Sequence, residues 1–185
     1  KLAKEAYYHK NANMERYIGI DPQIAELPQV ELLKGDREID KEISVFTNVT
    51  GRKSWPSGNR ELKVKKDGEF YQDDFLHEQY LVITENRRRV LMSGCAHNGI
   101  LNILEKYREI YGEDPDAVFS GFHMRKKSDY TQEDIEMIKE TAFQLKKSDS
   151  VFYTGHCTGE YPFGLMKEIM GERLVYVHSG DEVCI

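Results

Sequence analysis

Three of the predicted strands end in the same way, with a glycine, then a histidine within one to three residues, and then a predicted helix. The side chains concerned are Cys95 and His97 after strand 90–93, His123 after strand 117–120, and His156 and Cys157 after strand 151–154. Imidazole and thiolate groups are the ligands that zinc and related transition metals prefer. This repetition indicates a metal site that keeps an open position for water.

These loops can meet only if the three strands are parallel. The carboxyl ends of parallel strands lie at one edge of a sheet, and ligands bind at that edge in open α/β sheets. Glycine permits the tight turns, and the N-termini of the following helices favour an anion nearby. A rival interpretation makes Cys95 or Cys157 a nucleophile paired with a neighbouring histidine, but the sequence offers no clear oxyanion-hole arrangement.

Hydrophobic periodicity after residue 75 predicts strands that alternate with helices, which is an α/β architecture with a sheet covered by helices. The predicted strands are 81–84 and 90–92, joined as a hairpin by a charged turn, then 116–119, 151–154 and 174–177. The predicted helices are 98–111, 131–145 with Thr131 as N-cap, and 162–171. Before residue 70 the weaker pattern predicts a helix within 2–17, a helical turn at 22–27, strands at 30–33 and 43–49, and a mobile surface loop over 51–70.

The composition predicts one globular domain over residues 1–185. A net charge of −6 argues against nucleic acid or an anionic membrane as the main partner. Three cysteines, an odd number, do not suggest a disulfide framework, so a reducing cytoplasm is the expected location. No stretch approaches the roughly 18 apolar residues that a membrane span needs.

The ordered series "HEQYLVI", "VLMSGCAHNGILNIL", "SGFH" and "TGHCTG" resembles the metallo-β-lactamase superfamily. It is most similar to the branch of metal-dependent hydrolases related to a dihydropterin ribofuranosylaminobenzene 5'-phosphate synthase. The matching motifs run in order from His77 to Gly159. The resemblance implies an α/β fold of the αββα sandwich type, with metal ions at one edge of its two sheets.

The resemblance also implies roles for single residues. His77 aligns with the histidine that completes the first metal site, and His156 aligns with the histidine that completes the second. Cys95 falls where most relatives have a bridging aspartate, and His97 is the alternative ligand there. We expect His123, together with Arg125, to contact the anionic part of a substrate.

The superfamily motif H-x-H-x-D-H occurs nowhere in the 185 residues. The resemblance therefore implies that the chain is the C-terminal two thirds of such a fold. Either the protein extends upstream of Lys1, or the chain is a fragment that cannot build the dinuclear site alone. For the complete protein it implies a hydrolase in which two divalent ions, zinc with manganese or iron as alternatives, activate water. The expected substrate is a small anionic phosphodiester or other ester, pterin- or nucleotide-like. The alternatives are a remnant that binds a ligand or partner without turnover, and a thiol enzyme built on Cys95.

Overall fold

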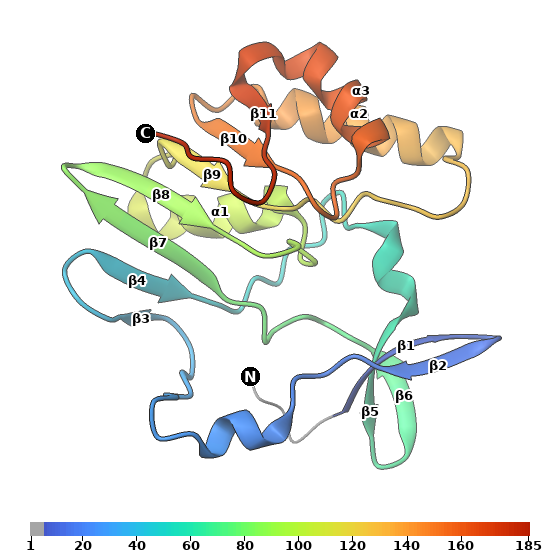
Figure 1. The fold of residues 1–185 in the computed structure, drawn as a ribbon. Coiled ribbons are helices and arrows are strands. Elements are labelled where there is room, and N and C mark those ends of the chain that lie inside the picture. Colours follow the sequence, from blue (N-terminus) through green and yellow to red (C-terminus); the bar gives the residue numbers. More distant parts are fainter. Residues whose placement is uncertain (1–5) are drawn as a thin grey trace.

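The computed structural model describes residues 6–185, whose strands form two sheets (Figure 1). The larger sheet has seven strands in the order β11-β10-β9-β8-β7-β4-β3, and the smaller has four in the order β2-β1-β5-β6. The strands of the larger sheet are β3 Arg37–Glu38, β4 Ile43–Phe46, β7 Tyr80–Glu85, β8 Arg88–Met92, β9 Ala117–Phe119, β10 Val151–Thr154 and β11 Leu174–Tyr176. Those of the smaller sheet are β1 Ala6–Asn11, β2 Met14–Tyr17, β5 Leu62–Lys66 and β6 Glu69–Gln72.

The part of the larger sheet that carries the three histidine loops is parallel. Strands β8, β9, β10 and β11 are neighbours in that order, and each pair is parallel. Their carboxyl ends therefore point to one edge of the sheet, as predicted. The smaller sheet lies on the side to which β8 and β10 point (Figure 1), so it borders the edge where the loops emerge.

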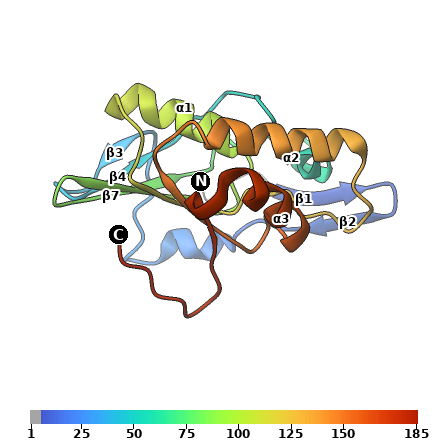
Figure 2. The same ribbon diagram turned by 90° about the horizontal axis from the view of Figure 1, so that it is seen from above.

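Three helices connect the parallel strands. They are α1 Ile100–Tyr111, α2 Gln132–Leu145 and α3 Glu160–Met170, and short 3₁₀ helices cover Pro22–Glu26, Ser57–Glu61 and Gly171–Arg173. Helices α1 and α2 lie on one side of the larger sheet (Figure 2), and α3 packs against α2. Across residues 6–185, no helix combines the length and the apolarity that a membrane span requires.

The main core forms between this helical layer and one face of the larger sheet. Strand residues Leu91, Val118 and Phe152 are buried together with Ile103 of α1 and Ile138 of α2. The alternation of side chains along each strand places every second residue on the opposite face. The α/β architecture predicted from hydrophobic periodicity is therefore confirmed.

The sequence-based expectations for the first 70 residues were wrong in several places. Residues 6–17 form a hairpin of β1 and β2 instead of a helix, and residues 2–5 lie outside the described part. Aromatic residues Tyr7 and Tyr8 favour a strand, and the Asn11 side chain accepts a hydrogen bond from the Asn13 amide, 2.9 Å away, in the turn. No regular strand covers 30–33, whereas the strand predicted over 43–49 is present as the shorter β4.

The segment predicted as a mobile loop, 51–70, is also structured. It contains a 3₁₀ helix, strand β5 and the start of β6. Asp67 and Gly68 join the two strands with φ angles of 50° and 85°. An Asp-Gly pair with two positive φ angles is the preferred two-residue hairpin turn, so a local signal for this hairpin was present in the sequence.

The N-terminus of α2 gives a prediction about stability. Thr131 and Asp134 form the predicted capping box, and Lys126 donates a further hydrogen bond to the Asp134 carboxylate. Burial of Asp134 opposes its ionisation, but the hydrogen bonds from Lys126 and Thr131 outweigh burial and lower the pKa of this carboxyl group to about 2. Asp134→Asn should reduce the free energy of unfolding at pH 7 by about 1–2 kcal/mol.

The sign of the pH dependence follows from the lowered pKa. The stabilisation is complete above the unfolded pKa near 4 and disappears as the pH falls through about 2. Urea unfolding of both proteins between pH 7 and pH 2 should therefore show a difference that shrinks only below about pH 4. An equal difference at every pH would contradict the assigned ionisation.

Candidate metal centre

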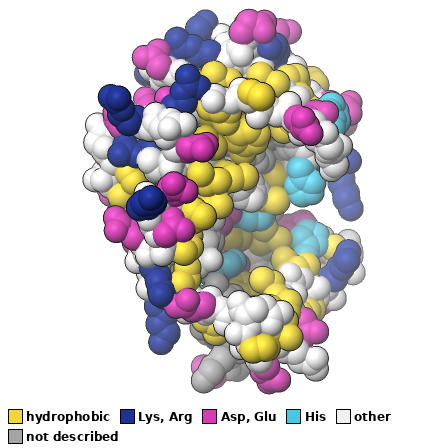
Figure 3. Space-filling model, turned by 60° about the vertical axis from the view of Figure 1, so that its left-hand side comes forward, with side chains coloured by type: hydrophobic (Ala, Val, Ile, Leu, Met, Phe, Trp, Pro, Cys, Tyr) yellow, Lys and Arg dark blue, Asp and Glu magenta, His cyan; other side chains and the backbone are white. Residues whose placement is uncertain are grey.

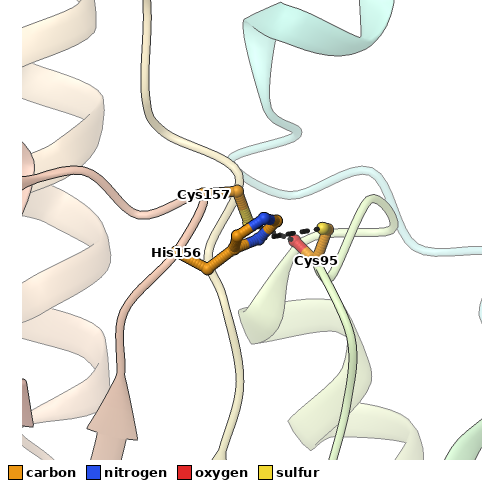
Figure 4. Close-up of side chains that lie close together, drawn as sticks. All are labelled: Cys95, His156 and Cys157. Atoms are coloured by element: carbon orange, nitrogen blue, oxygen red, sulfur yellow. Dashed lines mark hydrogen bonds between the residues drawn. The ribbon is translucent and has the colours of Figure 1, made fainter. Parts of the chain in front are cut away.

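Two of the strand-end loops bring three potential metal ligands together. Cys95 follows β8, while His156 and Cys157 follow β10, and the three side chains converge in Figure 4. Their ligand atoms all lie within 4.8 Å of one another, and Cys95 Sγ is 3.8 Å from His156 Nδ1. Within residues 6–185 this is the one group of three or more such residues that could hold an ion.

The chemistry of this donor set fits a zinc-like ion. Zinc is bound by thiolate sulfur at about 2.3 Å and by imidazole nitrogen at about 2.0–2.1 Å. Three donors separated by less than 5 Å can surround such an ion after small side-chain movements, and two thiolates with one imidazole suit a soft or borderline metal. A tetrahedral ion held by these three residues would keep a fourth position for water or substrate.

The backbone turns sharply in each of the three loops. Ala96, His123 and His156 have φ angles of 53°, 50° and 49°. Non-glycine residues rarely adopt positive φ, and such strain concentrates at functional sites. Each of these residues carries one of the thiol or imidazole side chains or is next to one in the sequence. The strained turns therefore help to direct these side chains toward one another.

Gly121, in the loop after β9, has no room for a side chain because the Cys157 sulfur lies beside it. A Cβ atom added to Gly121 would lie 2.5 Å from Cys157 Sγ, which is well inside van der Waals contact. By contrast, a Cβ atom added to Gly94 would meet nothing within 4 Å. The glycine after β9 therefore makes room for the thiol from the neighbouring loop.

The contact between Cys95 and Cys157 shifts the pKa values of the two thiols in opposite directions. Hydrogen bonding from Cys157 and from the His123 imidazole lowers the pKa of Cys95 well below that of an ordinary thiol. The same contact with Cys95, together with burial, raises the pKa of Cys157. The contact thus favours the thiolate form of Cys95, and the thiolate is the form of cysteine that binds a metal ion.

His97 and His123 lie next to this group but outside it. Their ring centroids are 4.1 Å apart, and both rings contact Cys95. His97 also stacks on Phe75, with 4.8 Å between ring centroids and an interplanar angle of 9°. The third loop thus reaches the same edge as the other two, as the sequence predicted.

His77 takes a different position, on the wall of a cavity beside the group. Its Nδ1 lies 3.7 Å from the carboxylate of the buried Asp73, and burial lowers the pKa of His77. The cavity, of about 250 Å³, is lined by His77, His97 and His123 and by aromatic side chains that include Tyr7 and Phe75. Figure 3 shows histidine side chains around a hollow between the upper and lower parts of the molecule.

Arg125 is exposed at the rim of the site. Its backbone amide donates to the Cys157 carbonyl oxygen at 2.9 Å, and its side chain packs against Gly159 at the start of α3. Within residues 6–185, its guanidinium group forms no ion pair. The two remaining histidines lie elsewhere, with His9 Nε2 2.8 Å from Glu61 and the exposed His178 Nδ1 3.4 Å from Asp181.

Two supporting residues were missed by sequence reasoning. Asn59 is fully buried and hydrogen-bonds both the ring and the backbone of His97. The carboxylate of Glu78 accepts hydrogen bonds from the backbone amides of His97 and Asn98, at 2.8 and 3.0 Å. Neither residue belongs to a ligand-like motif, although Glu78 adjoins His77 in the recognised "HEQYL" segment.

The space beside Gly121 gives a prediction about metal binding. Gly121→Ala should displace the Cys157 sulfur and weaken zinc binding about tenfold or more, by analogy with other disturbances of metal-site geometry. Gly94→Ala is the matched control, because this glycine lies in a neighbouring loop with open space around it. Competition with a chromophoric chelator measures both affinities. Equal affinities for the two variants would contradict the role given to Cys157.

Comparisons with known proteins found relatives of this chain by sequence and by structure. No family model matches the chain. An uncharacterized protein of Methanocaldococcus jannaschii, MJ0448, is 29% identical over 190 residues, which cover 98% of this chain and 66% of the relative. The 7,8-dihydropterin-6-methyl-4-(β-D-ribofuranosyl)-aminobenzene-5'-phosphate synthase of the same organism is 31% identical over 117 residues, which cover 62% of this chain and 38% of the synthase.

A solved structure extends the similarity to the fold. The crystal structure of Tm1679, a metal-dependent hydrolase of the β-lactamase superfamily, superimposes with a TM-score of 0.74 at 27% sequence identity. The similarity covers 98% of this chain and 68% of that protein. The chain thus spans about two thirds or less of each of these relatives. Its mixed α/β fold of two sheets and three helices matches the metallo-β-lactamase-like fold of that hydrolase, and the similarity to the synthase fits the branch that the motifs indicate.

Proposed function

We propose that the complete protein is a metal-dependent hydrolase that uses metal-activated water. The observation that carries the proposal is the group of Cys95, His156 and Cys157 at the carboxyl edge of the parallel strands. The similarity to a metal-dependent hydrolase supports it. A bound ion would lower the pKa of a water molecule and stabilise developing negative charge.

The proposed ion is zinc, because two of the three donors are thiolates. Manganese and iron remain the alternatives. We propose two ions in the complete protein, with His77 as a ligand of the first and His156 as a ligand of the second, and with Cys95 or His97 at the bridging position. His77 lies outside the group of Cys95, His156 and Cys157. As a ligand of the first ion it would therefore need further ligands that do not belong to this group.

The proposed substrate is a small anionic ester with a pterin- or nucleotide-like ring. Two features support a flat ring with an attached anion. The cavity beside the metal centre has aromatic walls, including Tyr7 and Phe75. At the rim, the exposed Arg125 guanidinium is available to an anion. His123, two residues before Arg125 in the sequence, lines the cavity. Small-ligand sites commonly combine apolar walls with a few such polar groups.

A thiol enzyme built on Cys95 is the less favoured interpretation. Cys95, His97 and Asn59 include the residue types of a Cys-His-Asn arrangement. Such an enzyme also needs free N–H groups for a developing oxyanion. The backbone amides of His97 and Asn98, two and three residues after Cys95, already donate to the Glu78 carboxylate.

A chain that binds a ligand without turnover is the second candidate function. The 185 residues do not include H-x-H-x-D-H, so this candidate concerns these residues by themselves. Equilibrium dialysis against Zn²⁺ distinguishes the two: tight stoichiometric binding supports a working site, and micromolar or weaker binding favours the remnant.

We also propose a reducing compartment such as the cytoplasm, because the thiol ligands must stay reduced, and Cys95, Cys157 and Cys184 form no disulfide.

His156→Ala tests the proposed function directly. In the complete protein, the variant should lose at least one bound ion per chain and about 100-fold or more of its phosphodiesterase activity, because a metal ligand and the water that its ion activates are lost together. Metal analysis and hydrolysis of bis-p-nitrophenyl phosphate measure the two effects. His178→Ala is the control, since that exposed imidazole pairs with Asp181 away from the site. Unchanged metal content and activity in His156→Ala would exclude the assignment.

A further inference from the structure

The side chain of Asn59 contacts His97 at two points. Its Oδ1 lies 3.0 Å from His97 Nδ1, and its Nδ2 donates to the His97 carbonyl oxygen at 2.6 Å. The Asn59 side chain is fully buried, in a 3₁₀ helix that lies 38 residues from His97 in the sequence. One amide side chain thus contacts both the ring and the backbone of the same residue.

The hydrogen-bond pattern indicates which nitrogen of the His97 ring carries the proton. Because Asn59 Nδ2 is the donor to the carbonyl oxygen, Oδ1 is the atom that faces the ring and can only accept. His97 Nδ1 must therefore carry the proton. The neutral ring then has an unprotonated Nε2, which is the nitrogen left to face Cys95, His123 or an ion.

Two further contacts hold His97 from other sides. Phe75 stacks against one face of its ring. Glu78 accepts from its backbone amide at 2.8 Å, so the residue is restrained at the amide, at the carbonyl oxygen and at the ring. Among these contacts, only the one from Asn59 selects which ring nitrogen is protonated.

We propose that Asn59 is a positioning residue that holds His97 in the Nδ1–H form and directs Nε2 at the metal centre. The proposal rests on the proposed function for the identity of the ion, but not for the form of the ring. Outer hydrogen-bond partners of ligand histidines raise the basicity of the ligand nitrogen, and their loss commonly reduces metal affinity 10- to 100-fold. Asn59 therefore acts on the ion through His97 and does not touch it.

The test uses this chain with ¹⁵N-labelled histidine and zinc as the probe. Without metal, at a pH of about 8 where an ordinary histidine is neutral, a long-range ¹H–¹⁵N correlation spectrum reports which His97 nitrogen carries the proton. We expect Nδ1–H in the unaltered chain and in Asn59→Asp, which retains the acceptor. Asn59→Leu should lose that preference and bind zinc 10- to 100-fold more weakly. Asn59→Asp keeps the acceptor for the ring but loses the donor to the His97 carbonyl oxygen, so its zinc affinity should fall by less than that of Asn59→Leu.

Asn102→Leu is the matched control for a general loss of stability. Asn102 is also a buried asparagine, and its side chain bonds the backbone of Lys53 and Asn98 but no histidine. It should lower the melting temperature without changing the form of His97 or the zinc affinity. The assignment fails if His97 carries its proton on Nε2 in the unaltered chain, or if Asn102→Leu weakens zinc binding as much as Asn59→Leu does.

The two proposals fail in different ways. If the unaltered chain binds no zinc, the metal-dependent function is contradicted, whereas the spectrum still decides whether Asn59 sets the form of His97. If Asn59→Leu does not fold, the spectrum of the unaltered chain and the comparison with Asn59→Asp remain decisive. Tight zinc binding with His97 in the Nε2–H form would overturn the positioning role alone.

Discussion

The site depends on the parallel, in-register pairing of β8, β9 and β10. Met92 pairs with Phe119, and Phe119 pairs with Tyr153, so the three strands end at the same level of the sheet. Because side chains alternate along a strand, a shift of one residue in any pairing would turn that loop's first side chains to the opposite face. The cysteines and histidines can converge only while this register is kept.

Hydrogen bonds beyond the strand ends extend the alignment into the loops. The Gly121 amide donates to the Gly94 carbonyl oxygen at 2.9 Å, which ties the β9 loop to the β8 loop. The Phe122 amide donates to the Thr158 hydroxyl at 2.9 Å, which ties the β9 loop to the β10 loop. These two hydrogen bonds hold the three ligand-bearing loops next to one another.

Sequence patterns predicted the parts of the molecule in which local signals and tertiary structure agree. The hairpin of β7 and β8, the three helices and the parallel strands follow from periodicity and capping residues, and the glycine-histidine repeats indicated that the loops meet. The hairpins of the smaller sheet were missed, although Asp67-Gly68 marks one of them. Asn59 could not have been predicted, because its role comes from a contact across 38 residues that no local pattern encodes.

X-ray absorption at the zinc edge tests the central claim most directly, because it reports the elements bound to the ion. If Cys95, His156 and Cys157 hold zinc, the zinc-loaded chain should show two sulfur ligands at about 2.3 Å and nitrogen or oxygen ligands at about 2.0–2.1 Å. A first shell of nitrogen and oxygen alone would contradict the account, because it would mean that neither thiolate binds the ion.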